Sequence, residues 1–525
     1  MTSTSICVLI VIIAYLAVTV LIGVYYSRKG SADDTANFYL GGRGLHPVVT
    51  AMSAEASDMS SYLLMGLPGL AYLCGVAEVG WTVIGLAVGT YLNFLLVAKR
   101  IRIYSATIGA NTVPDFFSRR YEDKKHILSC IAALVILIFF VPYTASGFKA
   151  VGTLFNSLFG WDYHVAMLIG AAVIIGYTVL GGFLAVSTTD LIQSVVMSVA
   201  LLIVIVFGIN QAGGLGTVVE NAKALPGYLN LTQGYDAASG SAGTFGFLSV
   251  VSTLAWGLGY FGMPHILLRF MAIRNPEEIK LSRRIAAVWV VVSMAIAVFI
   301  GIIGYSVSAA GKFDFLTTSA ESETIIIRIA DLMSSNGILF SIVAGIIMAG
   351  ILAATMSTAD SQLLAAASSM SEDLLHDFLG IKLSKKTSML VARLTVVAIA
   401  VIGVILAWNP NSSVFRVVSF AWAGFGAAFG PVVLLALFWK RSTREGATAS
   451  MAAGGIMVFV WKYLVAPHGG IFGIYELLPA FVVALVVNVV VSLCTPEPSE
   501  SIQRTFEQVK GGNTGADAPK GTVTI

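Results

Sequence analysis

Long apolar runs, separated by short polar stretches, fill almost the whole chain. Each run has roughly the 20 residues that an α-helix needs to cross a bilayer. The pattern predicts thirteen spanning segments, near residues 6–26, 47–73, 77–98, 127–156, 163–183, 190–210, 246–270, 285–308, 337–374, 388–408, 414–438, 447–466 and 472–494. We expect an all-α polytopic membrane protein, with a transmembrane domain over 1–499 and a disordered cytoplasmic tail over 500–525.

Polar residues interrupt these apolar segments at a few places. The stretch 53–61 carries two carboxylates and four hydroxyls, and Met356–Ser361 forms a second polar break. Between them, the stretch 256–264 combines three glycines with a proline, which loosens a helix. A charged group at this depth is costly, so it needs a partner. Interrupted spanning helices predict the binding site of a transporter near the bilayer midplane.

The order of the segments indicates an internal repeat. Segments two to six cover about 47–210, and segments seven to eleven cover about 246–438. Five crossings per set place the two sets in opposite orientations, which is an inverted-topology repeat. The first helix of each set contains a break, as this arrangement requires. The extra helices are 6–26, 447–466 and 472–494.

Charge gives the orientation of the chain. Only 11% of the 525 residues are charged and 57% are hydrophobic, whereas soluble domains are about 25% charged. Lys and Arg gather in alternate loops, after segments one, three, seven, nine and eleven. The loop after segment seven contributes Arg269, Arg274, Lys280, Arg283 and Arg284. This pattern places the N-terminus outside and the C-terminus in the cytoplasm. No basic block indicates binding to nucleic acid, and no obligatory protein partner is expected.

The loops and the N-terminus carry further signals. Arg28 and Lys29 follow the first apolar run, the reverse of the charge order in a cleaved signal peptide. The stretch 112–117 predicts a short interfacial helix that Pro114 and Asp115 begin. Loop 211–244 is expected to be partly structured at most. Loop 309–336 predicts a re-entrant or lid helix over an outer vestibule.

Adjacent hydroxyls at the second polar break suggest an ion site. A dehydrated small cation needs several oxygen ligands, which hydroxyls and free helix carbonyls supply. Ser357 and Thr358 would flank such an ion if the first broken helix offers carbonyls near Ala56 and Met59. The alternative is that both hydroxyls donate to carbonyls of their own helix. Asp58 would either balance the ion's charge or cap a half-helix restarting near Met59.

Other polar residues allow more than one interpretation. Asp190 is either an N-cap at the start of segment six or, with Asp360 and Ser361, part of a second cation or proton site. Tyr143 lies in a third polar patch at depth. Trp256 and Tyr260, four residues apart, form either packing or the wall of a pocket.

Several of these motifs resemble the sodium/solute symporter family, and within it the bacterial sodium/proline symporters. The resemblance covers about 35–440. It rests on Ala54–Pro68, on Phe38–Arg43, on Gly181–Ser187, on Trp256–Tyr260 with Pro264 and His265, and on Ala353–Leu364 with 371–374.

The resemblance implies a LeuT-type five-plus-five inverted repeat in a bacterial cytoplasmic membrane. It implies that sodium is the coupling ion, with no other cofactor, and that L-proline or a similar small amino acid is the substrate. The implied sodium residues are Ala56, Asp58, Met59, Ala354, Ser357 and Thr358. The implied substrate residues are Ser60, Ser61, Tyr143, Trp256, Tyr260 and Pro264.

The chain departs from the proline symporters at Glu55, Ser61, Tyr62, Met263 and Asp360. Another small amino acid or organic solute therefore stays an alternative substrate. Asp360 stands where other branches place a hydroxyl of a second sodium site, which favours a second cation beside Asp190. A nutrient sensor is a rival function, but the short polar tail has no room for a signalling domain. An enzyme is not expected, because the six histidines form no HExxH or other metal spacing. A channel is not expected either, since no pore loop repeats.

Overall fold

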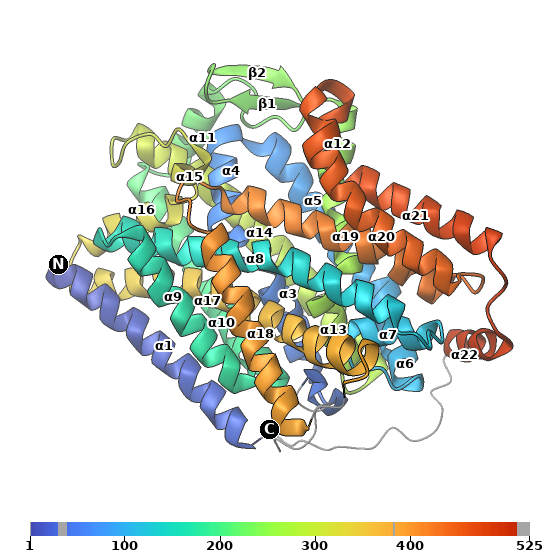
Figure 1. Cartoon of the computed structure of the whole chain (residues 1–525). Coiled ribbons are helices and arrows are strands. Elements are labelled where there is room, and N and C mark those ends of the chain that lie inside the picture. Colours follow the sequence, from blue (N-terminus) through green and yellow to red (C-terminus); the bar gives the residue numbers. More distant parts are fainter. Residues whose placement is uncertain (1, 30–38, 382–383, 512–525) are drawn as a thin grey trace.

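The computed structural model describes residues 2–29, 39–381 and 384–511, and this part of the chain is almost entirely helical. Ten of its helices are long and apolar enough to cross a membrane, and the bent pair α12–α13 raises this to eleven (Figure 1). The other two predicted segments fall on α9 and on the broken run from α3 to α4. The multi-pass all-α fold is confirmed, whereas the count of thirteen stays a prediction.

The first half of the chain runs from α1 to α10. Its elements are α1 (Ser3–Lys29), η1 (Gly41–Arg43), α3 (Pro47–Ser61), η2 (Tyr62–Gly66), α4 (Leu67–Cys74), α5 (Val76–Leu92), η3 (Asn93–Ala98), α6 (Lys99–Thr107), α7 (Val113–Arg120), α8 (Ile127–Phe159), α9 (Tyr163–Gly181) and α10 (Phe183–Gln211).

The second half begins with α11 (Leu215–Ala224), a two-stranded antiparallel hairpin and a broken helix. Its elements are β1 (Gln233–Asp236), β2 (Ser241–Thr244), α12 (Phe247–Leu254), η4 (Ala255–Gly262), α13 (Pro264–Ala272), η5 (Pro276–Glu278), α14 (Ile279–Ala309), α15 (Ser319–Ser322), α16 (Ile325–Ser334), α17 (Ile338–Ser368), η6 (Ser369–Phe378), α18 (Lys385–Leu406), α19 (Val414–Phe438), α20 (Arg444–Val460), η7 (Trp461–Val465), η8 (Ala466–His468), η9 (Gly470–Phe472), α21 (Leu477–Cys494) and α22 (Glu500–Lys510).

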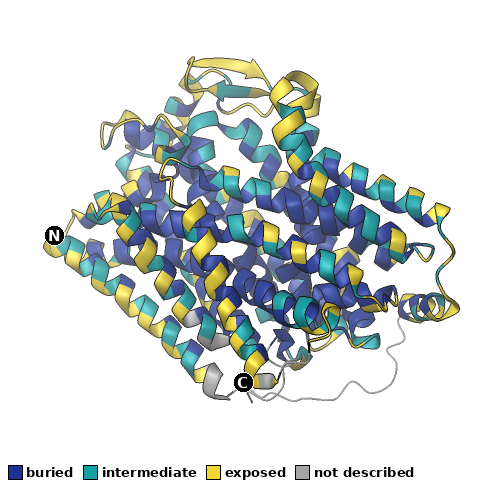
Figure 2. Ribbon diagram, in the orientation of Figure 1, coloured by how far each residue is buried: buried dark blue, intermediate teal, exposed yellow. Residues whose placement is uncertain are grey.

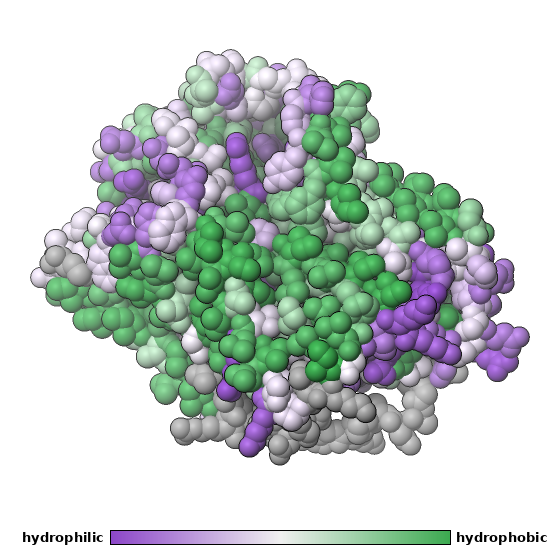
Figure 3. All heavy atoms as spheres, viewed as in Figure 1, coloured by the Kyte–Doolittle hydropathy of each residue, from purple (hydrophilic) through white to green (hydrophobic). Residues whose placement is uncertain are grey.

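The distribution of buried, exposed and apolar residues is that expected of a protein in lipid. Buried residues concentrate on the central helices, while the outer helices, such as α1, alternate exposed and partly buried positions (Figure 2). A broad apolar belt crosses the middle of the face in Figure 3, with hydrophilic side chains above and below it. Exposed Ile, Leu and Val side chains on α1, α10, α18 and α21 are those expected to face acyl chains.

The first spanning helix of the predicted repeat is broken at Ser60. This residue has φ +49° and ψ −168° inside an otherwise helical stretch. Its hydroxyl accepts the N–H of Tyr62 at 3.1 Å, so Ser60 satisfies a backbone donor that the break exposes. The break was predicted, and the helix restarts after Ser60, close to the predicted position near Met59; Ser60 takes the capping role considered for Asp58.

The second broken helix was also predicted. The tight helix η4 joins α12 to α13. The run formed by α12 and η4 meets α13 at a bend of 47°. Pro264 is the first residue of α13, where its missing N–H costs nothing. Gly259 is needed because a Cβ there would overlap the indole nitrogen of Trp422. The glycines therefore allow η4 to pack against α19 as well as loosening the helix.

The predicted break at Met356–Ser361 is wrong. Helix α17 continues through these residues without a non-helical position. The hydroxyls of Ser357 and Thr358 both donate to the carbonyl of Ala354, at 3.1 and 3.2 Å, within the same helix. Polar side chains that bond back in this way let a helix continue, so polarity alone does not mark a break.

The connecting segments carry the predicted short helices. Helix α7 begins after Thr112, whose hydroxyl accepts the N–H of Asp115 at 3.0 Å. Loop 211–244 holds α11 and the hairpin, in which Gln233 pairs with Thr244. Loop 309–336 folds into α15 and α16. N–H donors of Thr317 and Thr318 lower the pKa of Glu321, which closes a capping box at the start of α15.

The sequence predicts a disordered tail from residue 500, and this prediction is wrong for the first part of the tail. Glu500–Lys510 forms helix α22, with Ile502, Phe506 and Val509 buried on one face. The ring of Phe506 lies 5.5 Å from the guanidinium carbon of Arg120. The i, i+4, i+7 spacing of these apolar residues supplies the face that docks, and it outweighs the polar composition. Residues 512–525 of the predicted tail lie outside the described residues.

Candidate functional site

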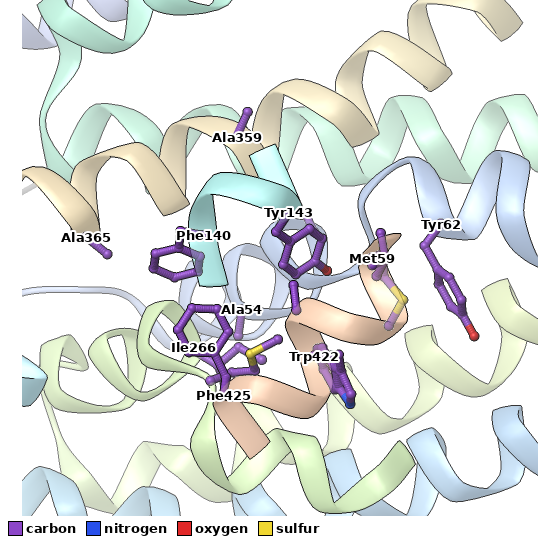
Figure 4. Close-up of a cluster of buried hydrophobic side chains, with 14 of the residues drawn as sticks. Ala54, Met59, Tyr62, Phe140, Tyr143, Ile266, Ala359, Ala365, Trp422 and Phe425 are labelled. Carbon is purple, nitrogen blue, oxygen red and sulfur yellow. The ribbon is translucent and has the colours of Figure 1, made fainter. Parts of the chain in front are cut away.

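The broken helix α3 brings a buried carboxylate against two tyrosines from other elements. The hydroxyl of Tyr260 in η4 donates to Oδ2 of Asp58 at 2.7 Å. The hydroxyl of Tyr143 in α8 donates to the carbonyl of Asp58 at 2.9 Å. Three predicted site residues therefore meet, although they are far apart in the sequence. Figure 4 shows Tyr143 and the neighbouring Met59, with Trp422 below them.

A group of neutral oxygens joins α3 to α17 one turn before the break. The hydroxyl of Ser357 lies 2.8 Å from the carbonyl oxygen of Ala56 and 3.1 Å from that of Ala354. Thr358 contributes a second hydroxyl 3.2 Å from the same Ala354 oxygen. All four residues were predicted as sodium ligands. Hydroxyl and carbonyl oxygens suit a hard cation.

Two other predicted sodium residues lie differently. The carbonyl of Met59 accepts the N–H of Tyr62 at the break. The carboxylate of Asp58 faces Tyr260. Both residues are still within three positions of Ala56 on the same helix, so they flank the oxygen group formed by Ala56, Ala354, Ser357 and Thr358.

The predicted substrate residues line two very small cavities around the break. One is bordered by Asp58, Tyr143 and Trp256, and the other by Ser60, Ser61 and Tyr143 again. Each has a volume of about 10 Å³, which is about the minimum for one water molecule. Ser61 is fully buried, and its hydroxyl has no hydrogen-bond partner among the described residues. Two of the predicted substrate residues, Tyr260 in η4 and Pro264 at the start of α13, line neither cavity.

An aromatic layer separates these cavities from a larger vestibule. The ring of Trp256 stacks on Tyr62 and Tyr475, with centroid separations of 5.5 and 5.0 Å, and lies 5.4 Å from Phe415. Beyond Trp256 the vestibule has a volume of about 670 Å³. Trp256 borders both spaces, so this layer closes the route between them. Trp256 is therefore part of a pocket wall, whereas Tyr260 borders none of these three spaces and packs edge-on against Trp422.

The predicted lid consists of α15, Glu323 and α16. Its first part, α15 with Glu323, borders the vestibule, and a buried ion pair joins it to the core. Glu323, between α15 and α16, accepts the ammonium of Lys149 at 3.0 Å. It also accepts the hydroxyl of Ser413 and the N–H groups of Val414 and Phe415 at the start of α19. Sequence reasoning missed this pair, because neither residue lies in a recognisable motif.

The predicted second cation site contains an arginine. Asp190 lies inside α10, eight residues into a helix that starts at Phe183, so its interpretation as an N-cap is wrong. Its Oδ2 lies 3.1 Å from the guanidinium of Arg269, and the same guanidinium donates to Ser361. The oxygen of Ser361 lies 3.4 Å from Asp360.

Sequence reasoning placed Arg269 in a cytoplasmic loop, yet it is a buried residue of α13. Arg269 lies only five residues after Pro264, which begins a helix. This short spacing is the sequence signal that places Arg269 in the helix rather than in the loop.

Comparisons with known proteins identify relatives over nearly the whole chain. The model of the sodium:solute symporter family matches residues 38–454. Proteins named sodium/proline symporter from Staphylococcus aureus strains USA300 / TCH1516 and JH9 are each 39% identical over 508 residues, which is 95% of either chain.

Solved structures share the fold. The substrate-bound outward-open state of a Na+-coupled sialic acid symporter superposes with a TM-score of 0.75 at 18% identity, over 94% of this chain and 99% of that one. A nucleobase-cation-symport-1 family transporter in a closed conformation gives a TM-score of 0.52 at 15% identity, over 91% of this chain and all of that one. The fold is that of the LeuT-type symporters. Together with the sequence match, this shows that the chain belongs to the sodium:solute symporter family.

Proposed function

We propose that the protein takes up L-proline, driven by a sodium gradient, across a bacterial cytoplasmic membrane by alternating access. The observation that carries the proposal is the approach of the Ser357 hydroxyl to the Ala56 carbonyl, 2.8 Å apart across α3 and α17. It supplies oxygen ligands where the broken helix passes an unbroken one. The sodium/proline symporters that are 39% identical to this chain support the choice of substrate.

Sodium would be held by the oxygens of Ala56, Ala354, Ser357 and Thr358, with Asp58 and Met59 beside them. None of these four oxygens carries a formal charge, so the buried carboxylate of Asp58 supplies the nearby negative charge. An ion at this position would hold α3 against α17. Sodium binding would thereby fix the broken helix on which the substrate residues lie.

The substrate would bind on the opposite side of the break. The half-helix that restarts after Ser60 has its N-terminal end at Ser61, which borders one of the small cavities, so the positive end of its dipole lies there. This end suits the carboxylate of an amino acid. Ser61, Tyr143, Trp256 and Tyr260 would surround the rest of it. The cavities of about 10 Å³ are too small for an amino acid, so binding requires Trp256 and its stacked neighbours to move.

Uptake into proteoliposomes tests the function. We expect labelled L-proline to accumulate only with an inward sodium gradient, and an excess of unlabelled proline to block it more than other amino acids do. A sodium ionophore, which collapses the gradient, is the control. Sodium-driven uptake of a different solute would mean that the departures at Ser61, Tyr62 and Met263 have changed the substrate specificity. Proline accumulation without sodium would contradict the coupling.

A further inference from the structure

The guanidinium of Arg269 lies where four helices meet, namely α3, α10, α13 and α17. Its Nε donates to the hydroxyl of Ser53 in α3 at 3.0 Å. One terminal nitrogen donates to the carbonyl of His265 in its own helix at 2.9 Å. The other donates to Asp190 in α10 at 3.1 Å and to Ser361 in α17 at 2.5 Å.

These contacts use four of the five N–H donors of the guanidinium. Each of its three nitrogens has an acceptor, and the ring of Phe183 lies 5.4 Å from its central carbon. The side chain is 2% exposed, and that of Asp190 is fully buried. Arginine keeps its charge in proteins, so this position always holds one positive charge. The hydroxyl of Ser53 also donates to Asp190, at 2.6 Å, and completes the network.

The oxygens around Arg269 are those that a second coupling ion would need. Asp190, Asp360 and Ser361 were predicted as its ligands, and Ser53 adds an oxygen from α3. The guanidinium already contacts Ser53, Asp190 and Ser361. The buried carboxylate of Asp360 lies 3.4 Å from the hydroxyl of Ser361. A sodium ion among them would have to displace these hydrogen bonds and lie beside a fixed positive charge. The residues present do not suit a second sodium ion.

We propose that Arg269 is the resident cation of this inner site, so that transport couples one sodium ion rather than two to each substrate. The inference rests on the proposed sodium-coupled function. In this arrangement Arg269 neutralises Asp190 and ties α13 to α3, α10 and α17 in every transport cycle. The only transported cation then binds at the oxygens of Ala56, Ala354, Ser357 and Thr358.

The test counts sodium ions in proteoliposomes that hold the full-length protein. Labelled sodium and labelled proline are measured together, and the charge moved per proline is obtained from the reversal potential. We expect one sodium ion per proline and a sodium Hill coefficient near one. Arg269→Gln removes the charge but keeps a polar side chain. In this variant Asp190 is left with a vacated oxygen site, and the Hill coefficient and the ion count should rise toward two.

Two further variants make the outcome specific. Asp190→Asn added to Arg269→Gln removes the anion that would attract the second ion, and the count should return to one. Arg274→Ala removes an exposed arginine that pairs with Glu278 and should leave the count at one.

Two sodium ions per proline in the wild type would overturn the inference while leaving the proposed function intact. An unchanged count in a transporting Arg269→Gln protein would also overturn it. Sodium-independent uptake by the wild type would instead refute the proposed function. If Arg269→Gln does not fold, equilibrium binding of labelled sodium to the wild type decides. One bound ion that Ser357→Ala removes supports the inference, and two bound ions reject it.

Discussion

Asp58 shows how single residues prepare the centre of the protein for a cation. The residue is 5% exposed, and its Oδ2 accepts a hydrogen bond from Tyr260. Oδ1 is buried and has no hydrogen-bond partner among the described residues. A buried carboxylate oxygen without a donor raises the free energy of the folded state. Any cation that approaches Asp58 lowers that free energy, so the residue favours the loaded form of the site.

The hydroxyl of Ser357 should contribute directly to sodium affinity. Ser357→Ala removes one oxygen next to the carbonyl of Ala56 and leaves the backbone of α17 intact. We expect the sodium concentration for half-maximal proline uptake to rise about tenfold, which corresponds to about 1.4 kcal/mol of binding free energy. Thr358→Ala should act in the same direction. Initial uptake rates at graded sodium concentrations measure the effect.

A matched control lies on the same helix. Ser368 is also buried, and its hydroxyl donates to the carbonyl of Ala365. Ser368→Ala should leave the sodium dependence unchanged, because this serine is ten residues beyond the oxygen group. The same sodium dependence in wild type, Ser357→Ala and Thr358→Ala would exclude α17 from the ion site.

Among the helices, the lid is held to the core through the start of α19. Glu323 accepts one ammonium, one hydroxyl and two N–H groups, and its side chain and that of Lys149 are each 2% exposed. The carboxylate also lies at the N-terminus of α19, where a negative charge is favoured. The helices α8, α16 and α19 therefore meet at a single buried ion pair above the aromatic layer.

Breaking this pair on one side should destabilise the protein strongly. Lys149→Met leaves the Glu323 carboxylate buried without its cation, at a cost of about 3 kcal/mol. The double variant with Glu323→Gln should recover part of this loss. Thermal unfolding of the purified proteins in detergent gives the Tm of the wild type, of Lys149→Met and of the double variant. Lys312→Met, an exposed lysine of the preceding loop, is the control. Equal Tm values for wild type and Lys149→Met would show that the pair does not hold the lid.

Periodicity predicted most helices correctly, and its failures have physical causes. Ser60 and the η4 stretch were found because glycine, proline and clustered polar groups disrupt helices locally. The polar run in α17 looked the same in sequence, but its hydroxyls found acceptors within the helix and it stayed unbroken. Helix α22 was missed because overall polarity concealed the apolar face of Ile502, Phe506 and Val509.

The candidate site was predicted in part, for a related reason. Residues that belong to motifs, such as Asp58, Ser357 and Tyr260, were identified with their neighbours. Arg269 was counted with the loop arginines, because a basic residue at the end of an apolar segment normally faces the cytoplasm. Only the tertiary packing of α10 against α17 brings Asp190 and Ser361 to its side chain. Partners more than seventy residues apart cannot be deduced from spacing alone.

For the whole molecule, the two polar faces differ in charge. The hairpin β1–β2, α11 and the lid form the face at the top of Figure 1, above the apolar belt. Helices α6, α7 and α22 lie on the other side of the belt. That side carries Lys99, Arg100, Lys440 and Arg441. Basic residues are retained in the cytoplasm during insertion, so the vestibule beyond Trp256 would open to the outside and serve uptake.

Labelling of single cysteines in a cysteine-free background tests this orientation. Ala237→Cys lies in the exposed turn of the hairpin, and Ser501→Cys lies on the exposed face of α22. A membrane-impermeant maleimide should label Ala237→Cys in intact cells and Ser501→Cys only after lysis. Labelling both variants in lysed cells controls for reactivity. The reverse result would place the vestibule in the cytoplasm. The same sodium gradient would then reach the broken helices from the opposite side, and the 670 Å³ vestibule would be an exit rather than an entrance.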